Sequence, residues 1–403
     1  MLDVSKVRSM FPIYKNNPNM IYMDTGATSL KPECVLNKME EYYTKYGVNI
    51  HRGVYELSYI ATNEYDIARE KVAKFLNAKF EEIVFTRNVS EALNFLALTY
   101  GDTFLKEGDV VITSELEHHS SVLPWIKMCE KKKAELKYVE LNEEGRITVE
   151  NFQKVMNEKV KVVALTYVSN VMGYITPIEK IIEIAHKYNA IVIVDAAQAV
   201  PHMKIDVKTL DADFLAFSGH KMMGPTGVGV LYGKKDLLKK LDPLYYGGDM
   251  NDEVSKYDVT VKEIPFRFET GTPAIAEVIG LGASIDLIEE IGYENIHSHT
   301  MELYNYAINQ LKDIQGITIY NKNTDTPVIA FNINGVHPHD AATVFDEAGI
   351  CLRAGHHCAQ LITKWLNCVG TLRGSFYIYN DYKDADMFVS KVKECVKFFN
   401  QFE

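Results

Sequence analysis

The stretch FLAFSGHKMMGPTGVG, residues 214–229, contains two apolar runs separated by a glycine-rich turn. The first run predicts a buried strand ending at Ser218, and the run from Val228 to Tyr232 predicts the next strand. Lys221 falls where the two strands meet, and burial there would disfavour its ammonium form. Such a lysine can serve as a Schiff-base nucleophile and proton shuttle. The ordinary alternative is a solvated lysine in a hairpin loop.

The stretch AIVIVDAAQAV, residues 190–200, predicts a second buried strand. Its consecutive apolar, mostly β-branched residues are typical of a parallel sheet that is covered on both faces. Asp195 would stand at the carboxyl end of this strand, where open α/β sheets bind ligands. A carboxylate there suits the pyridinium nitrogen of pyridoxal phosphate, which it keeps protonated. A helix or turn cap is the alternative for Asp195 alone, but its pairing with Lys221 is far more specific.

Two further predicted strand ends carry polar side chains. The run VVIT at 110–113 is followed by His118, whose imidazole can stack on a planar cofactor ring, although a solvated loop histidine is the alternative. The run FTRNVSEA at 85–92 leads from a strand into a helix, with Ser90 near the helix N-terminus. Free amide groups at helix N-termini favour phosphate, but Ser90 can equally be an ordinary cap.

Together these elements resemble the fold-type I pyridoxal-phosphate enzymes of the class V aminotransferase group. The resemblance covers nearly the whole chain, from Met20 to beyond Arg373. It implies an α/β fold in which residues 20–290 form a large cofactor-binding domain around a mostly parallel, seven-stranded-type sheet. Residues 1–19 and 291–403 would form a smaller α+β domain that carries the catalytic cysteine and the substrate arginine.

The resemblance also implies roles for individual residues. Lys221 would hold pyridoxal 5′-phosphate, Asp195 would pair with its ring nitrogen, and His118 would stack on the ring and act as an acid or base. Homodimers with shared active sites are implied, since Thr272 would reach the phosphate bound by the neighbouring subunit. Val89 departs from the threonine usual in the family. The remaining cofactor contacts would come from Gln198 at the phenolic oxygen, Asn170 near ring and substrate, and Ser90, Ser218 and His220 at the phosphate.

The segment GICLRAGHHCAQ, residues 349–360, places Cys358 close to Arg353 and two histidines. Positive neighbours raise the thiolate fraction of a cysteine, so Cys358 is the candidate nucleophile among the six cysteines. A zinc site that includes His337 and His339 is the alternative. No C-x-x-C or H-x-x-x-H spacing supports it, and no metal is expected within this chain.

The run RAGHHCA, residues 353–359, resembles the signature of the Suf-type (group II) cysteine desulfurases. The run TLRGSFYIYN, residues 371–380, resembles the strand of that family whose arginine, here Arg373, binds the substrate carboxylate in a bidentate manner. Gly374 and Leu361 depart from the alanine and proline usual there. The resemblance implies that L-cysteine is converted to L-alanine and that sulfur passes to Cys358 as a persulfide. It would then pass to an acceptor protein for iron–sulfur cluster assembly. Arg353 and Asn170 would assist in substrate binding.

Two other functions remain open at this point. A selenocysteine lyase or a cysteine sulfinate desulfinase would use the same Lys221 and Arg373, but its better leaving group would not need attack by Cys358. A non-catalytic scaffold that binds a sulfur-transfer partner would lack the yellow chromophore that Lys221 forms with the cofactor.

The segment GVHPHD, residues 335–340, concerns the sulfur acceptor. It resembles a segment of desulfurases that work with a small zinc-containing acceptor, in which a histidine equivalent to His339 becomes a zinc ligand during docking. The alternative is that His339 caps a helix beginning near Asp340.

Composition agrees with a globular protein of two domains. The chain has 403 residues, 47% hydrophobic residues and a net charge of −11, which argues against nucleic acid and anionic membrane as partners. We expect no leader or membrane span, and cysteines without framework spacing suit a reducing cytoplasm. A helix is expected from Tyr293 toward Ile314, and strands are expected at 328–333 and 375–379.

Overall fold

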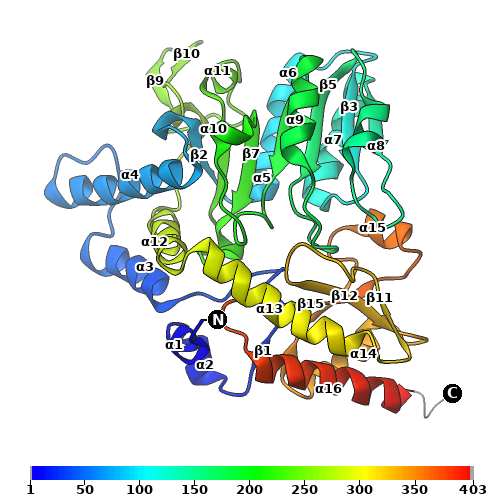
Figure 1. Ribbon diagram of the computed structural model, residues 1–403. Coiled ribbons are helices and arrows are strands. Elements are labelled where there is room, and N and C mark those ends of the chain that lie inside the picture. Colours follow the sequence, from blue (N-terminus) through cyan, green and yellow to red (C-terminus); the bar gives the residue numbers. More distant parts are fainter. Residues whose placement is uncertain (1, 400–403) are drawn as a thin grey trace.

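A seven-stranded sheet forms the centre of the computed structural model, which describes residues 2–399 (Figure 1). Its strand order is β2-β8-β7-β6-β5-β3-β4, and every adjacent pair is parallel except the two that involve β8. The mostly parallel sheet predicted from the sequence is therefore confirmed. The strands are β2 (Ile83–Thr86), β3 (Val110–Ser114), β4 (Glu135–Val139), β5 (Val160–Thr166), β6 (Ile191–Asp195), β7 (Phe214–Ser218) and β8 (Gly229–Gly233).

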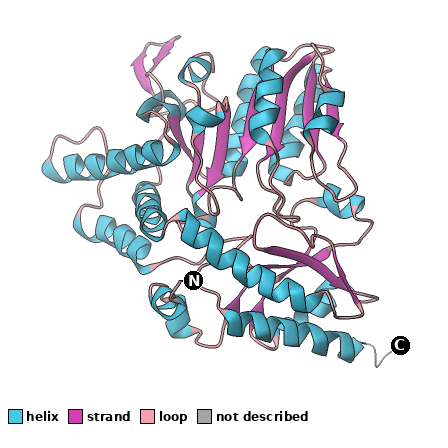
Figure 2. Cartoon of the chain, in the orientation of Figure 1, coloured by secondary structure: helices cyan, strands magenta, loops and turns pink. Residues whose placement is uncertain are grey.

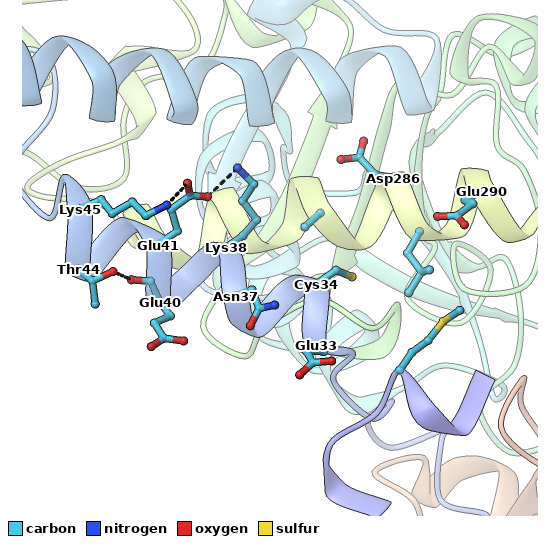
Figure 3. Close-up of a pocket in the computed structure, with 13 residues that line it drawn as sticks. Glu33, Cys34, Asn37, Lys38, Glu40, Glu41, Thr44, Lys45, Asp286 and Glu290 are labelled. Carbon is cyan, nitrogen blue, oxygen red and sulfur yellow. Dashed lines mark hydrogen bonds and ion pairs between the residues drawn. The ribbon is translucent and has the colours of Figure 1, made fainter. Parts of the chain in front are cut away.

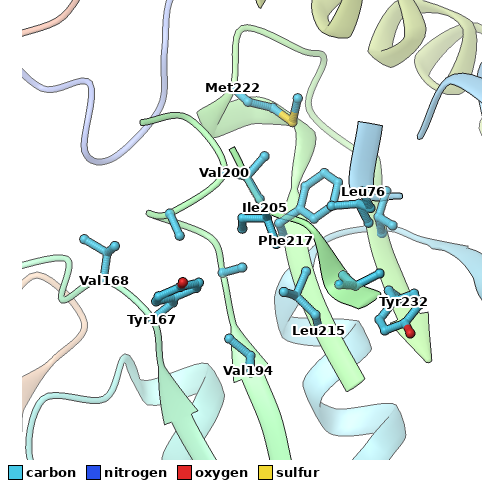
Figure 4. Packing of buried hydrophobic residues seen from close by; sticks show 14 of the residues in the cluster. Leu76, Tyr167, Val168, Val194, Val200, Ile205, Leu215, Phe217, Met222 and Tyr232 are labelled. Carbon is cyan, nitrogen blue, oxygen red and sulfur yellow. The ribbon is translucent and has the colours of Figure 1, made fainter. Parts of the chain in front are cut away.

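Both faces of this sheet are covered, as its apolar strands require. In β6, Val192 and Val194 belong to one hydrophobic cluster, whereas Ile191 and Ile193 belong to another. Because side chains alternate along a strand, the two clusters lie on opposite faces. Figure 4 shows part of the first cluster, where Val194 lies near Leu215. Figure 2 shows helices on either side of the strands. The main helices of this part are α3 (Glu33–Lys45), α4 (Glu56–Leu76), α5 (Val89–Leu96), α7 (His119–Lys132), α8 (Val149–Val155), α9 (Ile178–Lys187) and α12 (Ile275–Ile291).

A four-stranded antiparallel sheet lies below the first in Figure 1, in the order β11-β12-β15-β14. A third hydrophobic cluster packs its strands against helices α13, α14 and α16. The N-terminal helix α1 (Val4–Ser9) joins this part, because Arg8 Nε donates to Tyr379 O at 2.8 Å and its guanidinium pairs with Asp384. The elements are β11 (Ile317–Ile319), β12 (Val328–Ile333), β14 (Arg353–Gly355), β15 (Thr371–Ser375), α13 (Tyr293–Leu311), α14 (Pro338–Asp346), α15 (Gln360–Trp365) and α16 (Tyr382–Phe399).

Two smaller pairings complete the strands. Strand β1 (Ile21–Tyr22) pairs in parallel with β13 (Ile350–Cys351), and β9 (Asn251–Val254) forms a hairpin with β10 (Val259–Val261). The remaining α-helices are short: α2 (Ile13–Asn16), α6 (Asp102–Phe104), α10 (Val207–Leu210) and α11 (Lys235–Leu238).

The elements predicted after residue 290 are partly confirmed. The strand at 328–333 is β12, and the helix from Tyr293 is α13, which ends at Leu311. The strand predicted at 375–379 is wrong, because β15 ends at Ser375. Tyr377 N–H donates to Asn380 Oδ1 at 2.9 Å, so the chain turns there. Residues 376–379 are fully buried in this turn, and their apolar run therefore looks like a strand in the sequence.

Candidate active site

Lys221 ends a single 3-10 turn, Gly219–Lys221, between β7 and β8. The turn is tight: a Cβ added at Gly219 would lie 2.9 Å from Val228 Cγ1. The predicted place of Lys221, at the junction of two buried strands, is thus confirmed. Burial lowers the pKa of Lys221 to about 8, and Asp195 opposes this shift by favouring the ammonium form. The ammonium form still predominates at pH 7, but the neutral fraction of the amine is far larger than for a lysine of ordinary pKa.

Asp195 is the last residue of β6 and is almost fully buried. Its Oδ1 accepts the N–H of Ala197 at 3.0 Å. Burial raises the pKa of the carboxyl, while Lys221 lowers it, so the two side chains interact electrostatically. Gln198, one turn further along the chain, uses one amide N–H to bond Gly26 O at 2.7 Å.

His118 caps the N-terminus of α7, because its Nδ1 accepts the N–H of Ser120 at 3.1 Å. Burial and, secondarily, the charge of Lys221 lower the pKa of His118 to about 3. The ring is therefore neutral near pH 7 and is a weak base. These properties suit stacking on a planar group better than proton transfer.

Hydroxyl groups and a helix N-terminus gather at one end of the same site. Ser90 is the second residue of α5, and its Oγ lies 2.5 Å from Ser120 Oγ. Ser218 Oγ accepts the N–H of Val89 at 2.9 Å, and His220 Nδ1 lies 3.2 Å from Thr28 Oγ1. Hydroxyls gathered at a helix N-terminus form a suitable place for a phosphate.

Two arginines face each other across the other end of the site. Arg353 on β14 is paired in register with Arg373 on β15, and Arg373 is only 1% exposed. Arg373 donates to Asn170 O at 2.9 Å and to Asp24 Oδ1 at 3.2 Å, while Arg353 Nε lies 3.3 Å from Asp24 Oδ2. Gly26 leaves room for this group, because a Cβ there would lie 3.1 Å from Arg373 Cζ. The sequence interpretation gave Asp24 no role, although it lies just after the short strand β1, much as Asp195 lies at the end of β6.

Most of the predicted residues line one hollow of about 170 Å³. Asp195 and Gln198 are not among its lining residues. Thr272 lies elsewhere, in a separate hollow that also includes Gly271 and Arg52. The candidate residues that line the first hollow are Ser90, His118, Asn170, Ser218, His220, Lys221, Arg353, Cys358 and Arg373.

Cys358 is exposed and lies on the segment between β14 and β15. Both His357 and Cys358 have left-handed backbone conformations, with φ of 53° and 54°. His357, which the sequence interpretation left without a role, is buried and its Nε2 donates to Thr371 O at 3.0 Å. Burial lowers the pKa of His357 to about 2, so it contributes no positive charge beside the thiol. The cations that line the hollow with Cys358 are instead Arg353, Arg373 and Lys221.

The comparisons with known proteins agree with this geometry. The family model described as aminotransferase class-V matches residues 21–388. The chain belongs to the aminotransferase class-V family. A protein of Halalkalibacterium halodurans named "Probable cysteine desulfurase" is 46% identical over 402 residues, which cover 99% of each chain. A Staphylococcus aureus protein of the same name is 47% identical over 404 residues, covering 99% of this chain and 98% of the relative.

Solved structures show the same fold over almost the whole chain. The cysteine desulfurase CsdA of Escherichia coli has a TM-score of 0.93 at 36% identity, covering 99% of both chains. The apo cysteine desulfurase of Thermococcus onnurineus NA1 has a TM-score of 0.94 at 41% identity, covering 98% of this chain and 99% of that chain. The fold-type I architecture implied by the sequence is thereby confirmed.

The donor set of the site fits pyridoxal 5′-phosphate, the cofactor of this family. It offers an amine, a buried carboxylate, a neutral imidazole and a hydroxyl-lined helix N-terminus, as the charges and shape of that cofactor require. Asn170 Oδ1 and Arg373 Nε are also buried without a hydrogen-bond partner within the described residues. Buried polar atoms of this kind are normally satisfied, so both are available to a bound molecule.

Further observations concern the rest of the molecule. A groove of about 860 Å³ between α3 and α12 contains none of the candidate residues (Figure 3). Within residues 2–399, no three His, Cys, Asp or Glu side chains are grouped as a metal site, and no helix there is long and apolar enough to cross a membrane.

Helix α14 begins at Pro338 and is capped by His337, so the alternative that His339 caps it is wrong.

Proposed function

We propose that this protein is a pyridoxal-phosphate-dependent cysteine desulfurase, a sulfurtransferase that converts L-cysteine to L-alanine. The observation that carries the proposal is the single hollow lined by Lys221, Arg373 and Cys358. An amine, a carboxylate-binding guanidinium and an exposed thiol are the three groups this reaction needs. The names of the relatives from H. halodurans and S. aureus support the same activity.

Lys221 would hold the cofactor and would move the proton of the substrate Cα. When bound, pyridoxal phosphate supplies an electron sink for the charge that develops on Cα. Asp195 would keep the ring nitrogen protonated, and His118 would cover the ring. Gln198 and Asn170 would contact the ring substituents, while Ser90, Ser218 and His220 would hold the phosphate. The pKa of Lys221, about 8, supports its role because part of the amine is neutral at physiological pH.

Arg373 binds the substrate carboxylate, with Arg353 and Asn170 beside it. The shared pairing with Asp24 supports this assignment, because it holds both guanidinium groups at the pocket. The thiolate of Cys358 then attacks the sulfur of L-cysteine. An S–S bond forms and the Cβ–S bond breaks, with its electron pair returning to the carbon skeleton. The products are L-alanine and the Cys358 persulfide. The proton lost from the substrate thiol is balanced by the proton that the methyl group of alanine gains.

The active unit in this proposal is a homodimer with shared active sites. Thr272 lies in a hollow separate from the one that contains Lys221, which supports its assignment to the phosphate of the neighbouring subunit. The chain would divide into a large cofactor-binding domain, residues 20–290, and a smaller domain formed by residues 1–19 and 291–403.

The persulfide would pass to a sulfur-acceptor protein of the Suf type in the cytoplasm, for iron–sulfur cluster assembly. The exposure of Cys358 supports a direct transfer. A small zinc-containing acceptor would dock near His339, whose exposed side chain lies in the first turn of α14. Loss of acceptor-stimulated turnover in His339→Ala, with unchanged turnover in the absence of the acceptor, is the expected result. Unchanged stimulation would contradict this docking site.

The deciding experiment measures alanine and sulfide from L-cysteine in the presence of a dithiol reductant. The reductant releases sulfide from the persulfide and is itself oxidised to a disulfide. Wild type should form both products, and Cys358→Ala should form neither while keeping its yellow colour. Full activity in Cys358→Ala would contradict the proposal. It would instead favour a selenocysteine lyase or a cysteine sulfinate desulfinase.

A further inference from the structure

The segment that carries Cys358 is attached to the seven-stranded part of the molecule by a small number of hydrogen bonds. Asn170 Nδ2 donates to His357 O at 2.8 Å, and the N–H of His119 donates to Cys358 O at 2.7 Å. Both bonds reach residues whose backbone is left-handed, a conformation that non-glycine residues rarely adopt. The position of the thiol therefore depends on contacts made by other parts of the chain.

His119 makes a second contact with the same segment. Its Nε2 accepts the N–H of Gln360, the first residue of α15, at 3.1 Å. The first amides of a helix lack partners within the helix and are normally satisfied by a capping side chain. The residue at the cap position, Ala359, has no side-chain acceptor. His119, which begins helix α7, supplies that acceptor from a distant part of the chain.

The charge state of His119 favours this contact. Burial and the neighbouring His356 lower the pKa of the imidazole, so the ring is neutral near pH 7. A neutral imidazole has one acceptor nitrogen, whereas the protonated ring has none. His119 thus bonds the residues on either side of Ala359: its backbone N–H donates to Cys358 O, and its ring accepts the N–H of Gln360.

We propose that His119 is a positioning residue that holds the Cys358 thiol at the substrate sulfur. This inference rests on the proposed desulfurase function, because it assumes that Cys358 receives the sulfur. His119 itself does not line the hollow that contains Lys221. It would therefore affect the transfer of sulfur and leave the earlier steps, in which L-cysteine binds at Lys221 and Arg373, unchanged.

The test separates these steps in the intact holoenzyme. Stopped-flow absorbance after mixing with L-cysteine reports the change of the yellow chromophore, which precedes sulfur transfer. Quenched samples labelled with a thiol-reactive reagent report the persulfide on Cys358. In His119→Ala we expect a chromophore change at the wild-type rate and persulfide formation slowed by about 10- to 100-fold, the range typical of a misplaced reacting group. His119→Gln, which restores an acceptor of similar reach, should recover most of the rate.

Lys127→Ala is the matched control, since it alters an exposed side chain on the same helix that pairs with the exposed Glu130 at 2.7 Å. The proposal is overturned if persulfide forms in His119→Ala at the wild-type rate. It is equally overturned if the chromophore change slows as much as persulfide formation, which would indicate general damage to the pocket. A fully active Cys358→Ala would overturn the proposed function itself, whereas an inactive Cys358→Ala beside an unimpaired His119→Ala would overturn only the role of His119.

Discussion

The groove between α3 and α12 and the hollow at Lys221 each contain an exposed cysteine but differ in volume and in the burial of their charged groups. The groove has about five times the volume, roughly 860 against 170 Å³. Its charged groups are at least partly exposed, and some of them pair with one another, as Glu41 does with Lys38 and Lys45 (Figure 3). Although Cys34 is exposed, partial desolvation of its thiol, reinforced by the nearby carboxylates of Asp286 and Glu290, raises its pKa.

The smaller hollow brings together buried groups from distant parts of the chain. Arg373 is 1% exposed and Lys221 has a strongly lowered pKa, whereas the side chains of Lys38 and Lys45 are 43% and 69% exposed. Holding such groups away from water is costly, and it is characteristic of sites that do chemistry. Convergence of buried charge therefore identifies the site better than the size of a cavity does.

The largest expected difference between the two regions lies in their cysteines. Cys358→Ala should lower alanine formation from L-cysteine by at least about 1,000-fold, because it removes the nucleophile itself. Cys34→Ala should leave the rate unchanged. Alanine is measured by amino-acid analysis, with retained yellow colour as the control for cofactor binding. A large loss of activity in Cys34→Ala would mean that the groove takes part in the reaction.

The second prediction contrasts the cations of the two regions. Arg373→Lys should lower kcat/KM for L-cysteine by about 100-fold, since a lysine cannot replace the bidentate contact of a guanidinium with a carboxylate. Lys45→Ala, in the groove, should change it less than about twofold because the pair it breaks is exposed. Steady-state kinetics over a range of L-cysteine concentrations measures both. Equal effects of the two substitutions would contradict the assignment of Arg373.

The third prediction uses the lowered pKa of Lys221, about 8. The neutral amine is the form that reacts with the cofactor aldehyde, and its fraction increases about tenfold per pH unit below the pKa. Cofactor uptake by the cofactor-free protein should therefore accelerate with pH and level off above about 8. The appearance of yellow colour after mixing measures the rate. A rate that continues to increase to about pH 10 would indicate a lysine of ordinary pKa.

The smallest effect concerns the ion pairs of the groove. Lys38→Ala removes contacts with Glu41 at 3.0 Å and Glu64 at 3.7 Å, both partly exposed. Pairs of this kind contribute about 0.2–1 kcal/mol, and salt weakens them. Urea unfolding should show a loss within that range that becomes smaller at high salt. A loss of several kcal/mol would mean that the groove is a structural centre of the molecule.

Much of the site could be predicted because its residues follow buried strands. Asp195 and Lys221 end or follow apolar runs, and the carboxyl ends of parallel strands meet at one edge of the sheet. The position of a polar residue at the end of an apolar run is a local pattern, so it can be recognised in a single sequence. The strand predicted at 375–379 failed for the opposite reason, since burial of consecutive residues in a turn imitates a strand.

The contacts between distant segments could not be predicted. Asp24 joins Arg353 to Arg373 across more than three hundred residues of chain, and His119 caps a helix that begins at Gln360. Neither pairing has a periodic pattern, because each depends on how distant segments of the chain pack together. The sequence identified Arg353 and Arg373 as candidate residues, but it did not indicate which distant residues would contact them.

The position of β15 between β12 and β14 has a consequence for how such proteins can evolve. Arg373 is opposite Ala330 on one side and Arg353 on the other, so two neighbouring strands hold it in register. The segment that carries Cys358 is the connection between β14 and β15, outside this pairing. Insertions or deletions in that connection would leave Arg373 in place. Related proteins could thus have a longer or shorter β14–β15 connection, suited to another sulfur acceptor, while their substrate specificity stays the same.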